Sequence, residues 1–405
     1  MPPPPTQPIP TLAARPGDLE VDLRRHADAF QAVFGGAPPR LVFAPGRVNL
    51  FGGHLDYNGG PVMPTAIDRG TFIAFRPRAD RKVVMASTFD PARCEVDLDA
   101  LPDERTGLWA DYPLGVLREL ARRAPEARGL ELLFGGNLPV GAGLSSSASI
   151  CVGTAFAVDR AWELGLDTQA RVTAALAAER GFVGVQCGIM DPYAVGYAKP
   201  GHLLWLDCKD ESFTHLPIDF ERLAIGVIDS GVQRQLARSE FNDRVAQCAQ
   251  AFEALAPHAP GATVMRDVPE AVVEARAHTL EPVVLRRARH VVREVERTFA
   301  ARQALEAGDL VGLGARMFET HASLRDLYEC SCEELDVLVD AAAEAGCLGA
   351  RLTGAGFGGC IVVLIDAGRE DEALDAIQGR FDARFGRRPL AGFFRGDEGP
   401  REVST

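Results

Sequence analysis

The sequence lacks several features that would assign it to a particular class of protein. No apolar run approaches the roughly 20 residues that a transmembrane helix needs, and no period of about 20 to 50 residues repeats, which excludes solenoid folds. The nine cysteines include no Cys-x-x-Cys pair, so we expect reduced thiols. The first residues show no basic region followed by an apolar core, so we expect no secretory signal and a cytoplasmic protein.

Basic residues are also in the minority: 43 Lys and Arg oppose 56 Asp and Glu, and the formal net charge is -13. Proteins that bind nucleic acids or anionic membranes attract phosphates with a basic surface, so we expect neither kind of partner. A small-molecule substrate fits this charge better. ATP fits as well, because its phosphates would meet local backbone N–H groups and Mg²⁺ rather than the field of the whole protein. The oligomeric state is left open, and a monomer is compatible with the sequence.

The chain has enough apolar sequence for two domains, with 405 residues of which 47% are hydrophobic and 24% charged. We expect a disordered Pro-rich tail over 1–17 and domains over 18–210 and 211–397. Apolar spacing predicts helices at 18–34, near 112–123, and at 166–183, 240–256, 281–306 and 333–345. Strands are predicted at 40–44, 72–75, 82–86, 130–134, 202–206, 225–228, 349–352 and 360–365. This alternation predicts a mixed sheet with helices.

Polar side chains and glycines crowd into residues 44–60, which read Ala-Pro-Gly-Arg-Val-Asn-Leu-Phe-Gly-Gly-His-Leu-Asp-Tyr-Asn-Gly-Gly. The apolar residues 41–43 lead into this segment like a strand. Arg47, His54 and Asp56 would therefore lie where a strand opens into a loop, which is where function concentrates on rigid scaffolds. Taken alone, the segment fits a substrate pocket and a Gly-rich turn with a surface salt bridge about equally well.

A second Gly-rich segment, residues 138–149, reads Leu-Pro-Val-Gly-Ala-Gly-Leu-Ser-Ser-Ser-Ala-Ser and runs into an apolar helix over 150–157. Glycines let the backbone approach a ligand, and the free N–H groups of a first helical turn attract anions. The Gly-Lys-Ser/Thr ending of a Walker A loop is absent. A Ser-capped helix after a flexible loop is the alternative, but the full combination of glycines and serines favours phosphate binding.

A third cluster, residues 351–360, reads Arg-Leu-Thr-Gly-Ala-Gly-Phe-Gly-Gly-Cys between two apolar runs. Alone it would fit a Gly-rich hairpin. Together, the three segments resemble the GHMP kinases, and most closely the galactokinases among them. The resemblance extends to Cys-Gly-Ile-Met-Asp at 187–191 and to residues 286–292 and 321–332, and it covers roughly residues 40–395.

This resemblance implies an α+β fold with two domains. The N-terminal domain would resemble ribosomal protein S5 and bind sugar and ATP, and the C-terminal GHMP domain would be ferredoxin-like. The implied activity is the ATP-dependent phosphorylation of the anomeric (C1) hydroxyl of galactose, with Mg²⁺. Such catalysis consists mostly of positioning and charge stabilisation.

The resemblance also implies roles for individual residues. Asp191 would accept or orient the proton of the sugar 1-OH, and Arg47 beside it would stabilise the charge on the transferring phosphoryl group. Ser147 and Glu179 would hold Mg²⁺. The ATP-binding residues would be Gly141, Ala142, Gly143, Leu144, Ser145, Ser146, Ser147 and Ala148. The sugar-binding residues would be Gly53, His54, Asp56, Gly188, Asp191 and Phe241.

Two of these positions depart from the galactokinase pattern. Galactokinases usually have Glu where this chain has Gly53, and in the family that carboxylate hydrogen-bonds the sugar 6-OH. Its loss forfeits a charged hydrogen bond worth roughly 1.5 to 3 kcal/mol. Galactokinases also have Tyr where this chain has Phe241, so a second hydroxyl is missing.

Because of these two changes, the sequence does not determine which group the substrate carries at C6. Galactose fits if water satisfies its 6-OH, and we expect galactose because the rest of the chain resembles galactokinases. L-Arabinose, which has no 6-OH, is one alternative. Galacturonate is another, since Arg234 or Arg238 could bind its carboxylate. A sugar sensor that binds without catalysis is an alternative of a different class, although Arg47, Asp191 and the serine loop favour an enzyme.

Overall fold

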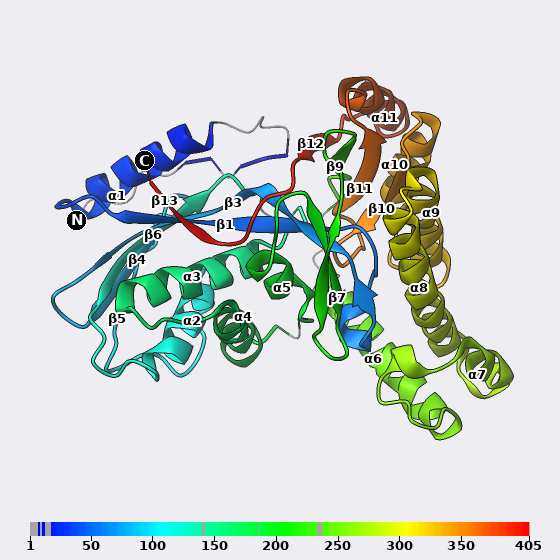
Figure 1. The fold of residues 1–405 in the computed structure, drawn as a ribbon, viewed down its shortest axis with the longest axis horizontal. Helices are drawn as coiled ribbons and strands as arrows, with labels where there is room; N and C mark the ends of the chain where they lie inside the picture. Colours follow the sequence, from blue (N-terminus) through cyan, green and yellow to red (C-terminus); the bar gives the residue numbers. More distant parts are fainter. Residues whose placement is uncertain are drawn as a thin grey trace.

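The computed structural model describes residues 7, 8, 10–12, 18–139, 142–185, 187–232 and 237–404 of the chain. These residues form an N-terminal and a C-terminal domain, on the left and right of Figure 1. The predicted mixture of helices and strands is confirmed. In the described ranges, no helix is both long enough and apolar enough to cross a membrane. The cytoplasmic location stays a prediction.

A six-stranded sheet forms the centre of the N-terminal domain. Its spatial order is β13 (Arg401–Val403), β1 (Arg40–Asn49), β3 (Pro64–Pro77), β6 (Leu130–Gly136), β4 (Lys82–Ser87) and β5 (Cys94–Asp97), and only β4 and β6 pair in parallel. One face packs on α1 (Leu19–Phe34), and the other packs on α2 (Asp111–Ala121), α3 (Ser146–Trp162) and α4 (Thr168–Ala177). Successive residues of β1 point to opposite faces, so Phe43 packs with α1 and Val42 with α3. Helices therefore cover both faces (Figure 1).

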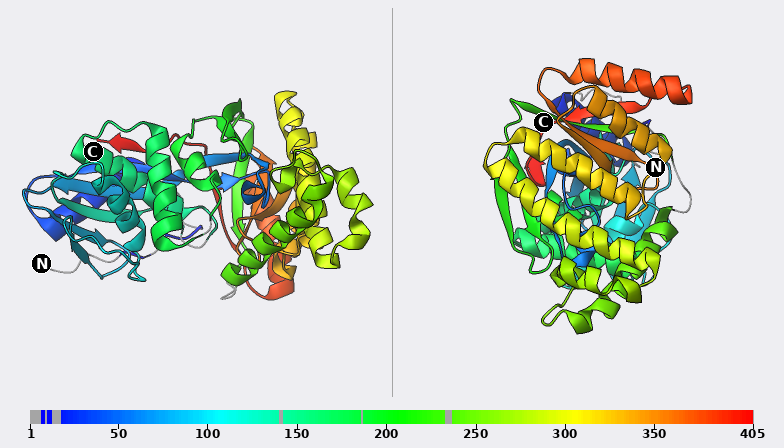
Figure 2. Two further views of the ribbon diagram at one scale, coloured as in Figure 1. Left: turned by 90° about the horizontal axis from the view of Figure 1, so that it is seen from below. Right: turned by 90° about the vertical axis from the view of Figure 1, so that its right-hand side faces the viewer.

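The C-terminal domain is built on a four-stranded antiparallel sheet. Its order is β10 (Gly349–Thr353), β11 (Cys360–Asp366), β9 (Leu223–Asp229) and β12 (Leu390–Phe394). The outer face packs on α10 (Glu333–Glu344) and α11 (Glu370–Phe385), while α8 (Pro282–Glu306) and α9 (Leu310–Asp326) contribute to the cores on both faces. These helices face the viewer on the right of Figure 2. The chain order of strand, helices, two strands, helix and strand is the ferredoxin-like pattern. On the inner face, Val227 shares a core with Val48 and Leu203 of the N-terminal domain.

Smaller elements complete the fold. They are α5 (Met190–Gly196), α6 (Ala237–Leu255), α7 (Glu270–Ala275), a π-helical stretch (Ala178–Val183), and a sheet of β2 (Pro61–Val62), β7 (His202–Asp207) and β8 (Phe213–Pro217). Two strand pairings join residues on either side of the predicted domain boundary near residue 210. The strand β8 pairs with β7, and the C-terminal strand β13 pairs with β1.

Some expectations from the sequence require correction. The helix predicted over 166–183 is α-helical only to Ala177 and then continues as a π-helix. The short strands β5, β8 and β13 escape prediction because they are only partly buried and carry few apolar residues. The strand β12 is missed as well, although it is mostly apolar. The tail is largely outside the described residues. Of its described residues, Leu12 is buried and the Gln7 N–H donates to the Thr88 carbonyl, while Gln7, Pro8 and Thr11 are exposed, so the disordered tail stays a prediction.

An irregularity in the central sheet directs β1 toward the inter-domain region. The pairing of β1 with β3 shifts register between Pro45 and Gly46, and such bulges bend a strand and re-aim its side chains. Glycines allow the close contacts there. A Cβ on Gly46 would lie 2.5 Å from Leu138 Cδ1 and 2.8 Å from the Leu144 carbonyl oxygen, so glycine lets the 138–149 loop reach the strand.

We expect Gly70→Ala to lower the free energy of unfolding by about 1 to 3 kcal/mol, the usual cost of overpacking. The added Cβ would lie 2.1 Å from the Ala44 carbonyl oxygen, a backbone atom that cannot rotate away. Gly379→Ala in α11 is the matched control, because nothing lies within 4 Å of its Cβ and alanine favours a helix. Urea denaturation compares both variants with the wild type. An unchanged midpoint for Gly70→Ala would contradict this account of the bulge.

Candidate active site

The centre of the site is a bidentate ion pair between Arg47, near the end of β1, and Asp191, in the first turn of α5. Arg47 Nε and Nη2 each donate to a different carboxylate oxygen of Asp191 at 2.7 Å. Arg47 Nη1 donates to the Gly143 carbonyl at 2.6 Å, and its backbone N–H donates to the Leu144 carbonyl at 3.1 Å. The Arg47 side chain is 6% exposed and that of Asp191 is 27% exposed. Arg47 therefore joins the carboxylate to the Gly-rich loop, and Asp191 keeps an open side.

The Gly-rich loop enters α3 through a serine in an unusual backbone conformation. Ser145 has φ 57° and ψ 51°, in the left-handed region. Its hydroxyl does not cap the helix; it donates to the Asp191 carboxylate instead. Ser146 and Ser147 begin α3, whose first turn contains no acidic residue. The positive end of the helix therefore suits an anion beside Asp191.

Apolar residues anchor this loop on both sides of its serines. Ala142 and Leu144 are buried in the core shared by the two domains, and Ala148, in the first turn of α3, is buried in the core of the N-terminal domain. Gly143 approaches the third glycine cluster, because a Cβ on it would lie 3.7 Å from the Thr353 carbonyl oxygen. Gly141 lies outside the described residues.

The π-helical stretch places Glu179 beside the start of α3. Its carboxylate is 2% exposed and hydrogen-bonds with Ser147. Burial raises its pKa to about 7, and the negative charge of Asp191 adds to the rise. A buried carboxylate facing a hydroxyl would gain from a cation. No group of three His, Cys, Asp or Glu in the described ranges could hold a metal alone, but Mg²⁺ needs few protein oxygens when phosphates and water complete its shell. Ser147 and Glu179 therefore fit Mg²⁺.

A pocket of about 340 Å³ opens beside the ion pair. It is lined by Arg47, Asn49, Gly52, Gly53, His54, Asp56, Tyr57, Val185, Cys187, Gly188, Met190, Asp191, Phe241, Arg351, Gly354 and Ala355. We call it the sugar pocket. The structure thus brings together every residue predicted from the sequence to bind the sugar, together with Arg47.

Asp56 and Gly188 are in close contact at the wall of this pocket. A Cβ on Gly188 would lie 1.8 Å from Asp56 Oδ2, so only glycine leaves room for that carboxylate. Burial and, to a smaller extent, the negative charge of Asp191 raise the pKa of Asp56 to about 6. Asp56 is therefore a strong hydrogen-bond acceptor near neutral pH and loses its charge under mildly acidic conditions.

An aromatic wall forms another side of the sugar pocket. His54 has φ 61°, a left-handed conformation that few side chains adopt, and its Nδ1 hydrogen-bonds with the Tyr57 hydroxyl at 2.7 Å. The Tyr57 hydroxyl also hydrogen-bonds with that of Tyr328 at 2.7 Å. Burial lowers the pKa of His54 to about 3, so the ring is neutral. Phe241 packs against His54 and Tyr57, with ring centroids 5.8 Å and 5.5 Å away.

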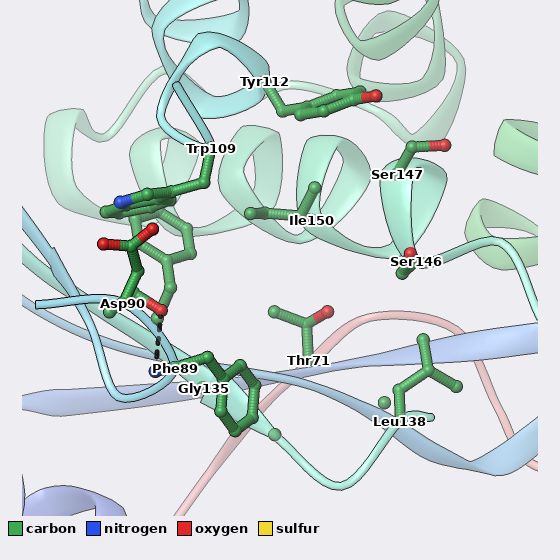
Figure 3. Close-up of a pocket in the computed structure, with 14 residues that line it drawn as sticks. Thr71, Phe89, Asp90, Trp109, Tyr112, Gly135, Leu138, Ser146, Ser147 and Ile150 are labelled. Carbon is green, nitrogen blue, oxygen red and sulfur yellow. Dashed lines mark hydrogen bonds between the residues drawn. The ribbon is translucent and has the colours of Figure 1, made fainter. Parts of the chain in front are cut away.

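A second pocket, of about 450 Å³, lies on the other side of the serines (Figure 3). It is lined by Gly70, Thr71, Ser87, Phe89, Asp90, Trp109, Tyr112, Phe134, Gly135, Gly136, Leu138, Ser146, Ser147 and Ile150. We call it the aromatic pocket. In Figure 3, Trp109 and Tyr112 stand on one side, and Ser146 and Ser147 close the end nearest α3. A flat ring with an anionic tail would fit this arrangement.

The sequence did not reveal the aromatic pocket, because its residues come from β3, β4, β6, α2 and α3 and share no local pattern. Nine lining residues of the sugar pocket were missed as well, and three of them have large polar side chains: Asn49, Tyr57 and Arg351. All three lie inside the glycine-rich segments at 44–60 and 351–360, so their position in those motifs was the available signal.

Comparison with known proteins agrees with this geometry. Residues 28–77 match the galactokinase galactose-binding signature, residues 111–199 the N-terminal domain of GHMP kinases and residues 301–383 their C-terminal domain. A galactokinase of Chloroflexus aggregans is 42% identical over 360 residues, which cover 89% of this chain and 92% of the relative. A galactokinase of Clostridium tetani is 35% identical over 378 residues, covering 92% and 96%.

Solved structures give the same relationship. The Lactococcus lactis galactokinase complexed with galactose superposes with a TM-score of 0.90 at 31% identity, covering 94% of this chain and 100% of that one. The mevalonate kinase of Methanococcus jannaschii shares the fold, with a TM-score of 0.65 at 18% identity and coverage of 89% and 99%. The predicted two-domain GHMP kinase fold is confirmed. The chain belongs to the galactokinase family of the GHMP kinases.

Proposed function

We propose that this protein is a galactokinase that transfers the γ-phosphoryl group of ATP to the anomeric hydroxyl of galactose. The observation that carries the proposal is the position of Asp191, which lines the sugar pocket and also accepts a hydrogen bond from Ser145 at the start of α3. Relatives named galactokinase at 42% identity, and the likeness to a galactokinase that binds galactose, support the same activity.

Asp191 and Arg47 are the proposed catalytic residues. The Asp191 carboxylate would take the proton of the sugar 1-OH as that oxygen attacks the γ-phosphorus, and ADP would leave with the electrons of the broken bond. Arg47 fixes both carboxylate oxygens of Asp191 through its two donors. Its position beside the loop also lets it stabilise the negative charge of the transferring group.

The triphosphate would lie at the start of α3, on backbone N–H groups and the hydroxyls of the serines. We assign the aromatic pocket to the base of ATP, because Trp109, Tyr112 and Phe89 offer flat apolar surface next to Ser146 and Ser147. Ser147 and Glu179 would hold Mg²⁺, which neutralises phosphate charge when bound. Asp56, His54, Gly188 and Phe241 would enclose the sugar ring.

With ATP, Mg²⁺ and galactose, we expect the protein to form ADP and galactose 1-phosphate. Asp191→Asn should lower kcat by about 10²- to 10⁴-fold, because an amide cannot accept the proton. Galactose binding in a thermal-shift assay should persist, since the amide keeps most hydrogen bonds. Asp28→Asn, at an exposed position on α1, is the matched control.

Turnover by Asp191→Asn at the wild-type rate would refute the assignment of Asp191. A wild-type protein that binds galactose and ATP without releasing ADP would instead be a sugar sensor, and the galactokinase proposal would fail.

Replacing Glu179 tests the magnesium site. Glu179→Gln should raise the Mg²⁺ concentration needed for half-maximal activity by at least about 10- to 100-fold, because losing even an outer contact to a metal costs that much. A titration of activity against Mg²⁺ at saturating ATP measures the shift. Glu253→Gln, at an exposed position on α6, is the control for loss of a carboxylate. An unchanged Mg²⁺ requirement in Glu179→Gln would exclude the ligand role.

The raised pKa of Asp56 predicts a pH dependence of sugar binding. Because this pKa is about 6 rather than its ordinary 3.8, the carboxyl group becomes protonated between pH 7 and pH 5. Galactose affinity should therefore fall as the pH drops through 6, since a neutral carboxyl accepts weaker hydrogen bonds from the ring hydroxyls. Isothermal titration calorimetry at pH 7.5 and pH 5 measures this, and Asp56→Asn should bind weakly and equally at both. Equal wild-type affinity at the two pH values would contradict the role of Asp56.

A further inference from the structure

The wall of the sugar pocket at Gly53 carries a buried guanidinium, that of Arg351, which forms no ion pair with any residue that the structure describes. Arg351, in β10, lines the pocket and is 1% exposed. A Cβ on Gly53 would lie 2.8 Å from Arg351 Nη1, so the guanidinium occupies the space beside the missing side chain. Its Nη2 donates to the Asn49 carbonyl at 2.7 Å, and its Nε has no hydrogen-bond partner in the described structure.

The nearest acidic group does not neutralise this guanidinium. Glu294 in α8 attracts Arg351 but forms no ion pair with it. Its carboxylate is already paired with Arg297 and accepts hydrogen bonds from Thr320 at 3.1 Å and from the Gly52 and Gly53 N–H groups at 3.3 Å. Burial lowers the pKa of Arg351 only to about 10, so it stays charged at neutral pH.

The histidines near this guanidinium add no further positive charge. Burial lowers the pKa of both His54 and His290 to about 3, so their rings are neutral. The side-chain Oδ1 of Asn49, on the same wall, is buried without a partner. Buried charges and polar atoms are normally paired. The unpaired guanidinium nitrogen of Arg351 is therefore suited to a negatively charged group on the ligand, and the unpaired Asn49 oxygen is suited to a hydroxyl that donates to it.

We propose that the site also phosphorylates hexuronic acids of the galactose configuration, with Arg351 binding the C6 carboxylate. This inference rests on the proposed galactokinase activity. Position 53 faces C6 in the resemblance to galactokinases, and glycine there removes the carboxylate that would repel a uronate. The reaction is unchanged at C1. The bond from O1 to the γ-phosphorus forms, the bond to the bridging oxygen of ATP breaks, ADP leaves with that electron pair, and the O1 proton passes to Asp191.

The substrate series galactose, galacturonate and L-arabinose tests the proposal with ATP and Mg²⁺, measuring kcat/KM for ADP release. L-Arabinose has the same ring without any C6 substituent, so it gives the value expected when nothing binds at Arg351. We expect galacturonate to exceed L-arabinose by about 10- to 100-fold, as a charge-assisted hydrogen bond provides. If the protein phosphorylates galactose but its kcat/KM for galacturonate is equal to or lower than that for L-arabinose, the uronate proposal is overturned and the galactokinase function stands. Turnover of none of the three by the folded protein would overturn both.

Variants assign the effect to the charge at Arg351. Arg351→Gln should lower the ratio of galacturonate to galactose kcat/KM by about 10-fold or more. Gly53→Glu should lower the same ratio further than Gly53→Gln, because the two side chains have similar size and only one repels a carboxylate. An unchanged ratio in Arg351→Gln, or equal ratios in the two Gly53 variants, would overturn the role of Arg351. The wild-type series decides the substrate class even if a variant fails to fold.

Discussion

The site depends on the paired hydrogen bonds between Arg47 and Asp191. Burying an ion pair costs desolvation, which is recovered only when the geometry is good and the remaining donors are satisfied. Both conditions hold here, because Arg47 uses two nitrogens on Asp191 and a third on the Gly143 carbonyl. One guanidinium thereby fixes the end of β1, the first turn of α5 and the Gly-rich loop relative to one another. The sugar pocket and the start of α3 meet at Asp191 for this reason.

The surrounding fold makes that convergence possible through local backbone irregularities. The register shift at Pro45 and Gly46 redirects β1, and Gly46 lets the 138–149 loop approach. Ser145 and His54 hold left-handed conformations, which cost free energy and persist only where the surrounding structure enforces them. The π-helical stretch then places Glu179 against Ser147. These irregularities of the backbone lie where the chemistry is proposed to occur.

The sequence predicted several long elements from local patterns, and it predicted part of the sugar pocket through the resemblance of its glycine-rich motifs to those of galactokinases, but it did not predict the 17-residue helix α9. Apolar spacing marks α1 and α8, and the glycine-rich motifs contain Arg47, His54 and Asp56. The aromatic pocket could not be predicted, because Phe89, Trp109 and Tyr112 meet only after separate elements pack. The same limit applies to Arg351. Its place in a motif is visible in the sequence, but its lack of a compensating carboxylate emerges only from the packing of α8 and β10.

The most direct test of this account is a double-mutant cycle on kcat with Arg47→Gln, Asp191→Asn and the double variant, each verified to be folded. If the two residues act as one unit, removing the second after the first should change kcat little, so the double variant should be about as slow as the slower single variant. Losses that multiply in the double variant would show that Arg47 and Asp191 act independently, and they would contradict the claim that their ion pair organises the site.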